Sequence, residues 1–168
     1  DNIAAYMWAV KGAYTVNQNV SLSAGVDYLS GQDDSDKVTA FNPLYGTHHK
    51  FYGAMDYFYA SPYPDYGLFD KHVSLIVKPI DKLTLDLTYH HFSSHQSIYV
   101  DGSNKKGMGS EIDFAFTYKV RPYVTLQGGY STMFGTEAFS VAKGGDHKRW
   151  QDWGWLSLNI NPIIFKSK

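Results

Sequence analysis

Hydrophobic and polar residues alternate with a period of two along most of the chain. The clearest case is residues 83–90, where Leu and Tyr at odd positions alternate with Thr, Asp and His at even positions. Residues 111–120 repeat the pattern, with Ile, Phe, Tyr and Val at the even positions. Such alternation predicts β-strands with one apolar and one polar face. No stretch shows the apolar spacing that an amphipathic helix requires.

Seven strands are expected from this pattern. They span about residues 3–16, 20–32, 67–80, 83–99, 109–120, 124–136 and 150–165. Three tight turns alternate with three longer polar segments, residues 33–66, 100–108 and 137–149. Short turns at one end and long loops at the other are typical of outer-membrane barrels. The sequence therefore predicts an all-β fold, an antiparallel up-and-down transmembrane β-barrel with long outer loops.

The predicted number of strands indicates an incomplete barrel. Bacterial single-chain barrels have an even number of strands, and a seven-stranded sheet leaves two edges whose backbone groups lipid cannot satisfy. We therefore expect residues 1–168 to be a single barrel segment, the C-terminal part of a larger barrel, or a segment that other chains close.

Aromatic residues and charges indicate which face meets lipid. Aromatic side chains lie near both ends of the predicted apolar face, as in the two interfacial girdles of membrane barrels. They are Tyr14, Tyr118 and Phe165 at the short-turn end and Tyr28, Tyr130 and Phe134 at the long-loop end. The opposite face carries polar and charged side chains in mid-strand, which a wet lumen tolerates. The pore-lining candidates are Lys11, Asp27, Lys78, Asp86, His90, Glu111, Asp113, Lys119 and Gln127. Both signs of charge occur among them, so the lining is not strongly anion-selective.

Composition excludes several other classes of protein. The 15 Lys and Arg residues are balanced by 16 Asp and Glu residues, so the basic excess of a nucleic-acid-binding protein is missing. The chain has no cysteine, which excludes disulfide scaffolds and Cys-ligated metal sites. The longest apolar run, Ile3–Val10, is far shorter than the roughly 20 residues of a membrane-spanning helix.

One segment carries a family resemblance. Residues 41–53, Phe-Asn-Pro-Leu-Tyr-Gly-Thr-His-His-Lys-Phe-Tyr-Gly, followed by Met55–Phe58, resemble the alginate export family of outer-membrane β-barrels, as found in Bacteroidota. Residues 25–31, 110–113 and 129–134 fit the same resemblance. It implies a barrel of more than seven strands that passes polar or anionic molecules across the outer membrane. The motif-loop residues are Phe41, Asn42, Pro43, Tyr45, Gly46, His48, His49 and Lys50.

Two clusters are candidate metal sites. Asp33, Asp34 and Asp36 offer carboxylates to calcium, but the EF-hand glycine and terminal glutamate are missing, so a solvated loop is preferred. His91 and His95 are about 13 Å apart along one strand, too far to share a metal. We therefore expect no metal site and no cofactor. The aromatic segment 51–66 is interpreted as a loop that packs inward rather than a sugar-binding surface.

The preferred function is an outer-membrane channel that passes polar or anionic solutes, saccharides among them. The expected partners are the lipid bilayer, these solutes and other outer-membrane proteins, with no nucleic acid. The alternative is a structural or accessory barrel of a larger outer-membrane complex with no open pore. A soluble all-β binding domain is the third interpretation. No nucleophile motif or other catalytic signature is present, so the chain is not expected to be an enzyme.

Overall fold

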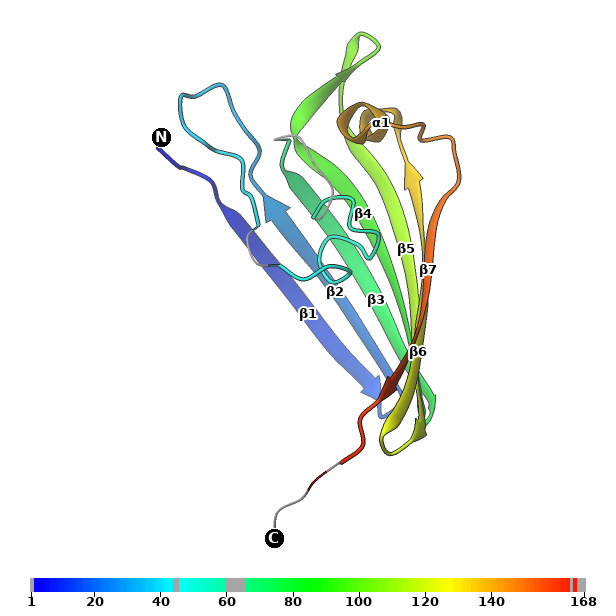
Figure 1. The fold of residues 1–168 in the computed structure, drawn as a ribbon. Helices are drawn as coiled ribbons and strands as arrows, with labels where there is room; N and C mark the ends of the chain where they lie inside the picture. Colours follow the sequence, from blue (N-terminus) through cyan, green and yellow to red (C-terminus); the bar gives the residue numbers. More distant parts are fainter. Residues whose placement is uncertain (1, 44–45, 60–65, 164, 166–168) are drawn as a thin grey trace.

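Seven antiparallel strands form one sheet in which each strand pairs only with its neighbours along the chain (Figure 1). The computed structural model describes residues 2–43, 46–59, 66–163 and 165. The strands are β1 (Met7–Asn17), β2 (Val20–Leu29), β3 (Leu68–Ile80), β4 (Leu83–Val100), β5 (Ser103–Arg121), β6 (Val124–Gly135) and β7 (Gln151–Ile160). The all-β, up-and-down architecture predicted from the alternation is confirmed. The sheet is not closed, because β1 and β7 do not pair with each other within the described residues.

The segment predicted as a long loop at residues 100–108 is instead a tight hairpin. β4 continues to Val100 and β5 begins at Ser103, so only Asp101 and Gly102 separate them. Both residues have positive φ angles, 44° and 81°. A two-residue turn of type I′ requires this combination, and Asp-Gly is among its preferred sequences. The prediction was wrong because it relied on the polar composition of residues 100–108 and overlooked the Asp-Gly turn signal.

A short helix, α1 (Glu137–Lys143), occupies part of the segment predicted as a third loop, residues 137–149. The Thr136 hydroxyl accepts a hydrogen bond from the Phe139 amide and caps the first turn, and Gly144, with φ 79°, ends the helix. Ala138, Phe139 and Ala142 are buried. α1 packs on β4 and β5 at the end of the sheet opposite the β1–β2, β3–β4 and β5–β6 turns.

Two strand ends also differ from the prediction. Residues 3–6 precede β1 and are not part of it. Ile3 instead forms an isolated parallel bridge with Val38, in the long segment between β2 and β3. β7 ends at Ile160, two residues before Pro162, which has no N–H to continue a ladder. Phe165 therefore lies beyond the strand. Tyr14, Tyr28, Tyr118 and Phe134 lie on strands near their ends, whereas Tyr130 lies in the middle of β6.

The sheet has one apolar and one polar face. Side chains of the apolar face remain exposed within this chain: Leu156, Tyr14 and Val10 are 72%, 70% and 64% exposed. No second sheet covers them in the described part of the chain. The α-helix present there, α1, is too short to span a membrane.

The polar face is covered in part by the long segment between β2 and β3. Residues 46–59 of this segment, named here the covering loop, lie across the sheet in Figure 1. Together with α1 they enclose a buried hydrophobic cluster near the long-loop end of the sheet. Its members include Phe58 from the covering loop, Phe139 from α1, and Leu68, Phe92 and Met133 from the strands.

Candidate functional site

Strand register brings charged and polar side chains into adjacent rows on the polar face. Gly25 lies opposite His72, His72 opposite His90, and His90 opposite Glu111. In the neighbouring rows, Asp27 faces Asp70 and Thr88 faces Asp113. Because alternate residues of a strand share a face, these rows form a continuous polar surface across β2 to β5.

The residues selected as pore-lining candidates share this face. Lys11, Asp27, Asp86, His90, Glu111, Asp113, Lys119 and Gln127 occupy register positions of the polar face. Lys78 follows the irregularity after Val77, at the tight-turn end of β3. That these side chains line a pore stays a prediction. The structure adds Asp70, His72, Trp153 and Trp155, which sequence reasoning did not select and which occupy the same face.

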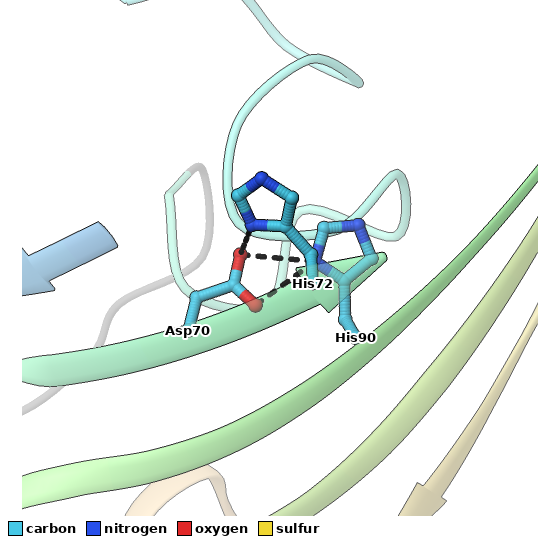
Figure 2. A group of neighbouring side chains, drawn as sticks. All are labelled: Asp70, His72 and His90. Atoms are coloured by element: carbon cyan, nitrogen blue, oxygen red, sulfur yellow. Dashed lines mark hydrogen bonds and ion pairs between the residues drawn. The ribbon is translucent and has the colours of Figure 1, made fainter. Parts of the chain in front are cut away.

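A buried carboxylate, Asp70, faces two neighbouring histidines (Figure 2). The Asp70 side chain is fully buried, and its Oδ1 and Oδ2 atoms lie 3.0 Å and 2.9 Å from Nδ1 of His90. Nδ1 of His72 is 3.6 Å from Oδ2 of Asp70 and 3.7 Å from Oδ2 of Asp27. Nε2 of His90 is 3.6 Å from Oδ2 of Asp113. These five side chains come from four adjacent strands.

The covering loop is held on the polar face by two carboxylates of β5. The Met55 amide donates a hydrogen bond to Oε1 of Glu111 at 2.9 Å, and the Ala54 amide donates to Oδ2 of Asp113 at 3.2 Å. Gly53 has a φ angle of 87°, and a Cβ atom there would lie 2.6 Å from Oε2 of Glu111. Only glycine permits this approach, so Glu111 and Gly53 together fix where the loop lies.

Aromatic contacts complete the attachment of the loop. The rings of Phe58 and Phe92 have centroids 4.5 Å apart, and His49 stacks on Trp153 of β7 at 4.3 Å. Tyr57 meets Phe139 of α1 edge-on at 5.0 Å. Tyr52 is buried, and this burial, together with the charges of Asp27 and Asp70, raises its pKa to about 12. The inward packing expected for the aromatic segment is therefore seen for Tyr52, Tyr57, Phe58, Tyr59 and Tyr66, whereas Phe51 is exposed. Residues 60–65 lie outside the described residues.

The motif-loop residues form the first part of the covering loop and the chain segment just before it. The Phe41 amide bonds to the Ser30 carbonyl at 2.9 Å. His49 contacts Asp56 through its backbone N–H at 2.8 Å and through Nδ1 at 3.0 Å. The His48 ring lies 5.7 Å from Tyr59, which also packs against Gly46. Asn42 and Pro43 precede the loop, Lys50 lies over the Phe51 ring, and Tyr45 is outside the described residues.

The calcium candidates do not come together as a site. Asp33 accepts hydrogen bonds from the amide and hydroxyl of Ser35, and these bonds hold its pKa below the usual range. Asp34 and Asp36 are exposed. Among the described residues, the side chains that could ligate a metal and have their ligand atoms close together are Asp70, His72 and His90.

A cavity of about 370 Å³ separates the covering loop from the sheet. Its wall includes Lys11, Asp27, Asp70, His72, Asp86 and His90, and Lys50, Phe51 and Tyr52 border it from the loop. A second cavity of about 270 Å³ adjoins Asp86, His90 and Asp113. The strand side of this space thus carries carboxylates, histidines and Lys11.

The fold and this surface define a class of protein. An up-and-down antiparallel sheet, with lipid-type side chains on one face and charged side chains under an inward-folded loop on the other, is the wall of an outer-membrane β-barrel. The family model described as "Alginate export" matches residues 1–151, so the chain belongs to the alginate export family. Membership implies an outer-membrane export or porin-like function. A comparison with curated proteins finds no match.

Proposed function

We propose that this chain forms part of the wall of an outer-membrane channel for small polar solutes, narrowed by the covering loop. The observation that supports this proposal is the separation of the two faces. Large apolar side chains point away from the covering loop and stay exposed, which suits hydrocarbon, while charged side chains and two cavities lie on the other side. Passage would depend on electrostatic filtering and pore size rather than on catalysis.

The charges on the polar face favour neutral or cationic solutes over polyanions. Lys78 and Lys119 lie near the tight-turn ends of their strands. Lys11 lies in mid-strand on β1, but four carboxylates of β2 to β5 border the two cavities, and their charges would repel a polyuronate. They are Asp27, Asp70, Asp86 and Asp113. The indole ring of Trp155 on the same face offers a stacking surface for saccharides, whereas His49 already stacks on Trp153.

The test is the ion selectivity of the complete protein in planar bilayers. Asp86 is the best position for a charge reversal, because it borders both cavities and makes no hydrogen bond to the covering loop among the bonds described. In a salt gradient, Asp86→Lys should move the reversal potential toward anion selectivity. Asp81→Lys is the matched control, since it makes the same charge change in the tight turn between β3 and β4. An unchanged reversal potential in Asp86→Lys would contradict the proposal.

A barrel with a filled lumen is the second candidate function, and the packing of the covering loop favours it. Phe58 and Tyr52 are buried against the polar face, and α1 closes part of the same end. Such a barrel would serve as a structural subunit of a larger outer-membrane complex. It would purify with stoichiometric partners and show no conductance, whereas the channel conducts alone.

A further inference from the structure

We propose that Asp70, His72 and His90 form a binding site for a divalent transition-metal ion of the zinc type. The proposal rests on the side-chain geometry of β3 and β4 and does not depend on the transport function. One ligand atom from each of the three residues lies within 4.8 Å of the other two. The two histidine rings approach the same carboxylate from neighbouring strands, as Figure 2 shows.

The distances fit a tetrahedral ion. Zinc–nitrogen and zinc–oxygen bonds of about 2.0–2.2 Å place neighbouring ligand atoms roughly 3.3 Å apart. The Asp70 carboxylate lies 2.9 Å from Nδ1 of His90 and 3.6 Å from Nδ1 of His72, on either side of this value. The ligand atoms of His72 and His90 lie within 4.8 Å of each other, so the two rings would move together by up to about 1.5 Å to hold one ion.

The donor atoms select the kind of ion. Two imidazole nitrogens and one carboxylate oxygen suit zinc and its neighbours in the transition series, whereas calcium and magnesium prefer sites made of oxygen. The three ligands border the 370 Å³ cavity, so a fourth ligand can come from that side. Asp27, with its Oδ2 atom 3.7 Å from Nδ1 of His72, is the nearest protein candidate, and a water molecule is the alternative.

A buried ring nitrogen without a hydrogen bond supports a ligand at this position. Among the described residues, Nδ1 of His72 is buried without a hydrogen-bond partner, since its contacts to Asp70 and Asp27, at 3.6 Å and 3.7 Å, are ion-pair distances. Buried polar atoms in folded proteins nearly always have a partner, and each exception calls for an explanation. A bound cation would use this lone pair.

The surroundings orient both rings. The second nitrogen of His90, Nε2, faces the Asp113 carboxylate at 3.6 Å, an ion-pair distance, and a small approach of the two groups would give the carboxylate–histidine–metal arrangement of known sites. The His72 ring rests on Gly25 of β2, where a Cβ atom would lie 2.6 Å from Nε2. Gly25 is therefore a positioning residue, because alanine there would displace the ring.

The experiment is a zinc titration of the complete protein, purified in detergent and stripped of metal with EDTA. Calorimetry should show about one tight site per chain that is weakened more than about tenfold in His72→Ala and in His90→Ala. His91→Ala is the matched control. His91 is adjacent on β4, but its ring lies on the apolar face and bonds to Ser110 at 3.1 Å. Equal zinc affinity in the wild type and in both site variants would overturn the proposal.

A second measurement needs no variant and remains decisive if a substitution prevents folding. Co²⁺ bound to the wild-type protein should give the intense visible absorption of a tetrahedral site, and added Zn²⁺ should displace it. A weak octahedral spectrum alone would show that the three side chains are an ion-pair network without a metal.

Discussion

Phe58 anchors the covering loop to the polar face, and its truncation should release the loop. The side chain is 4% exposed and its ring lies 4.5 Å from Phe92 and 6.1 Å from Phe139. Replacing a buried phenylalanine by alanine costs about 3–5 kcal/mol. We take about 3 kcal/mol for Phe58→Ala, because a loop can relax partly into the gap. At about 1.4 kcal/mol per tenfold change, the ratio of docked to undocked loop falls roughly a hundredfold.

Hydrogen exchange of the Met55 amide reports this equilibrium directly. That amide is bonded to Glu111, so it exchanges when the loop leaves the sheet. Its protection should fall roughly a hundredfold in Phe58→Ala, while amides in the centre of β2 should keep theirs. Phe51→Ala is the control, since Phe51 belongs to the same loop but is 41% exposed. If both variants lose the same protection, or neither does, Phe58 is not the anchor.

Two further predictions concern the hairpin turn and the helix. Gly102→Ala should lower the free energy of unfolding by about 1 kcal/mol, because φ is 81° and nothing lies within 4 Å of the added Cβ, so only backbone strain acts; an unchanged denaturation midpoint would contradict this. Burial lowers the pKa of Lys143 to about 8, against an ordinary value of about 10.4. The unfolded chain therefore binds more protons between these two values, and the free energy of unfolding should rise with pH across that window. Thermal unfolding at pH 8 and pH 10 should show the rise in the wild type and a smaller one in Lys143→Met.

The two faces of the sheet could be predicted from the sequence because strand alternation is local. Residues two apart share a face whatever the rest of the chain does. For this reason Asp86 and Asp113 were placed correctly relative to Leu87 and Phe114. The family resemblance was predictable too, because residues 41–53 carry it as a contiguous motif.

The histidine–carboxylate cluster was missed because it depends on register between strands. Continuing the pairing of Ile80 with Leu83 would place His72 opposite His91. The irregularity between Val77 and Ile80 shifts the pairing by one residue and brings His72 opposite His90 instead. The sequence did contain a signal of this shift. The polar positions of β3 and β4 are even-numbered in both strands, and two even-numbered residues lie opposite each other only when the pairing is shifted by one residue. Lys71, which interrupts the apolar positions of β3, concealed it.

The covering loop shows a different limit of sequence reasoning. Its attachment joins Met55 to Glu111 and His49 to Trp153, pairs that are far apart along the chain and follow no period. Sequence alone indicated inward packing from the aromatic content but not which strand would receive the loop. Contacts of this kind are decided by tertiary packing.

The β4–β5 hairpin is longer than a membrane crossing requires, and this has a practical consequence. Its strands have 18 and 19 residues. At about 3.4 Å per residue they extend roughly 60 Å, more than twice the apolar band of about 25 Å even before tilt is considered. The tip at Asp101 and Gly102 is the natural place for a peptide tag. Antibody staining of intact cells that carry the tag would show whether this end of the sheet faces the outside of the cell.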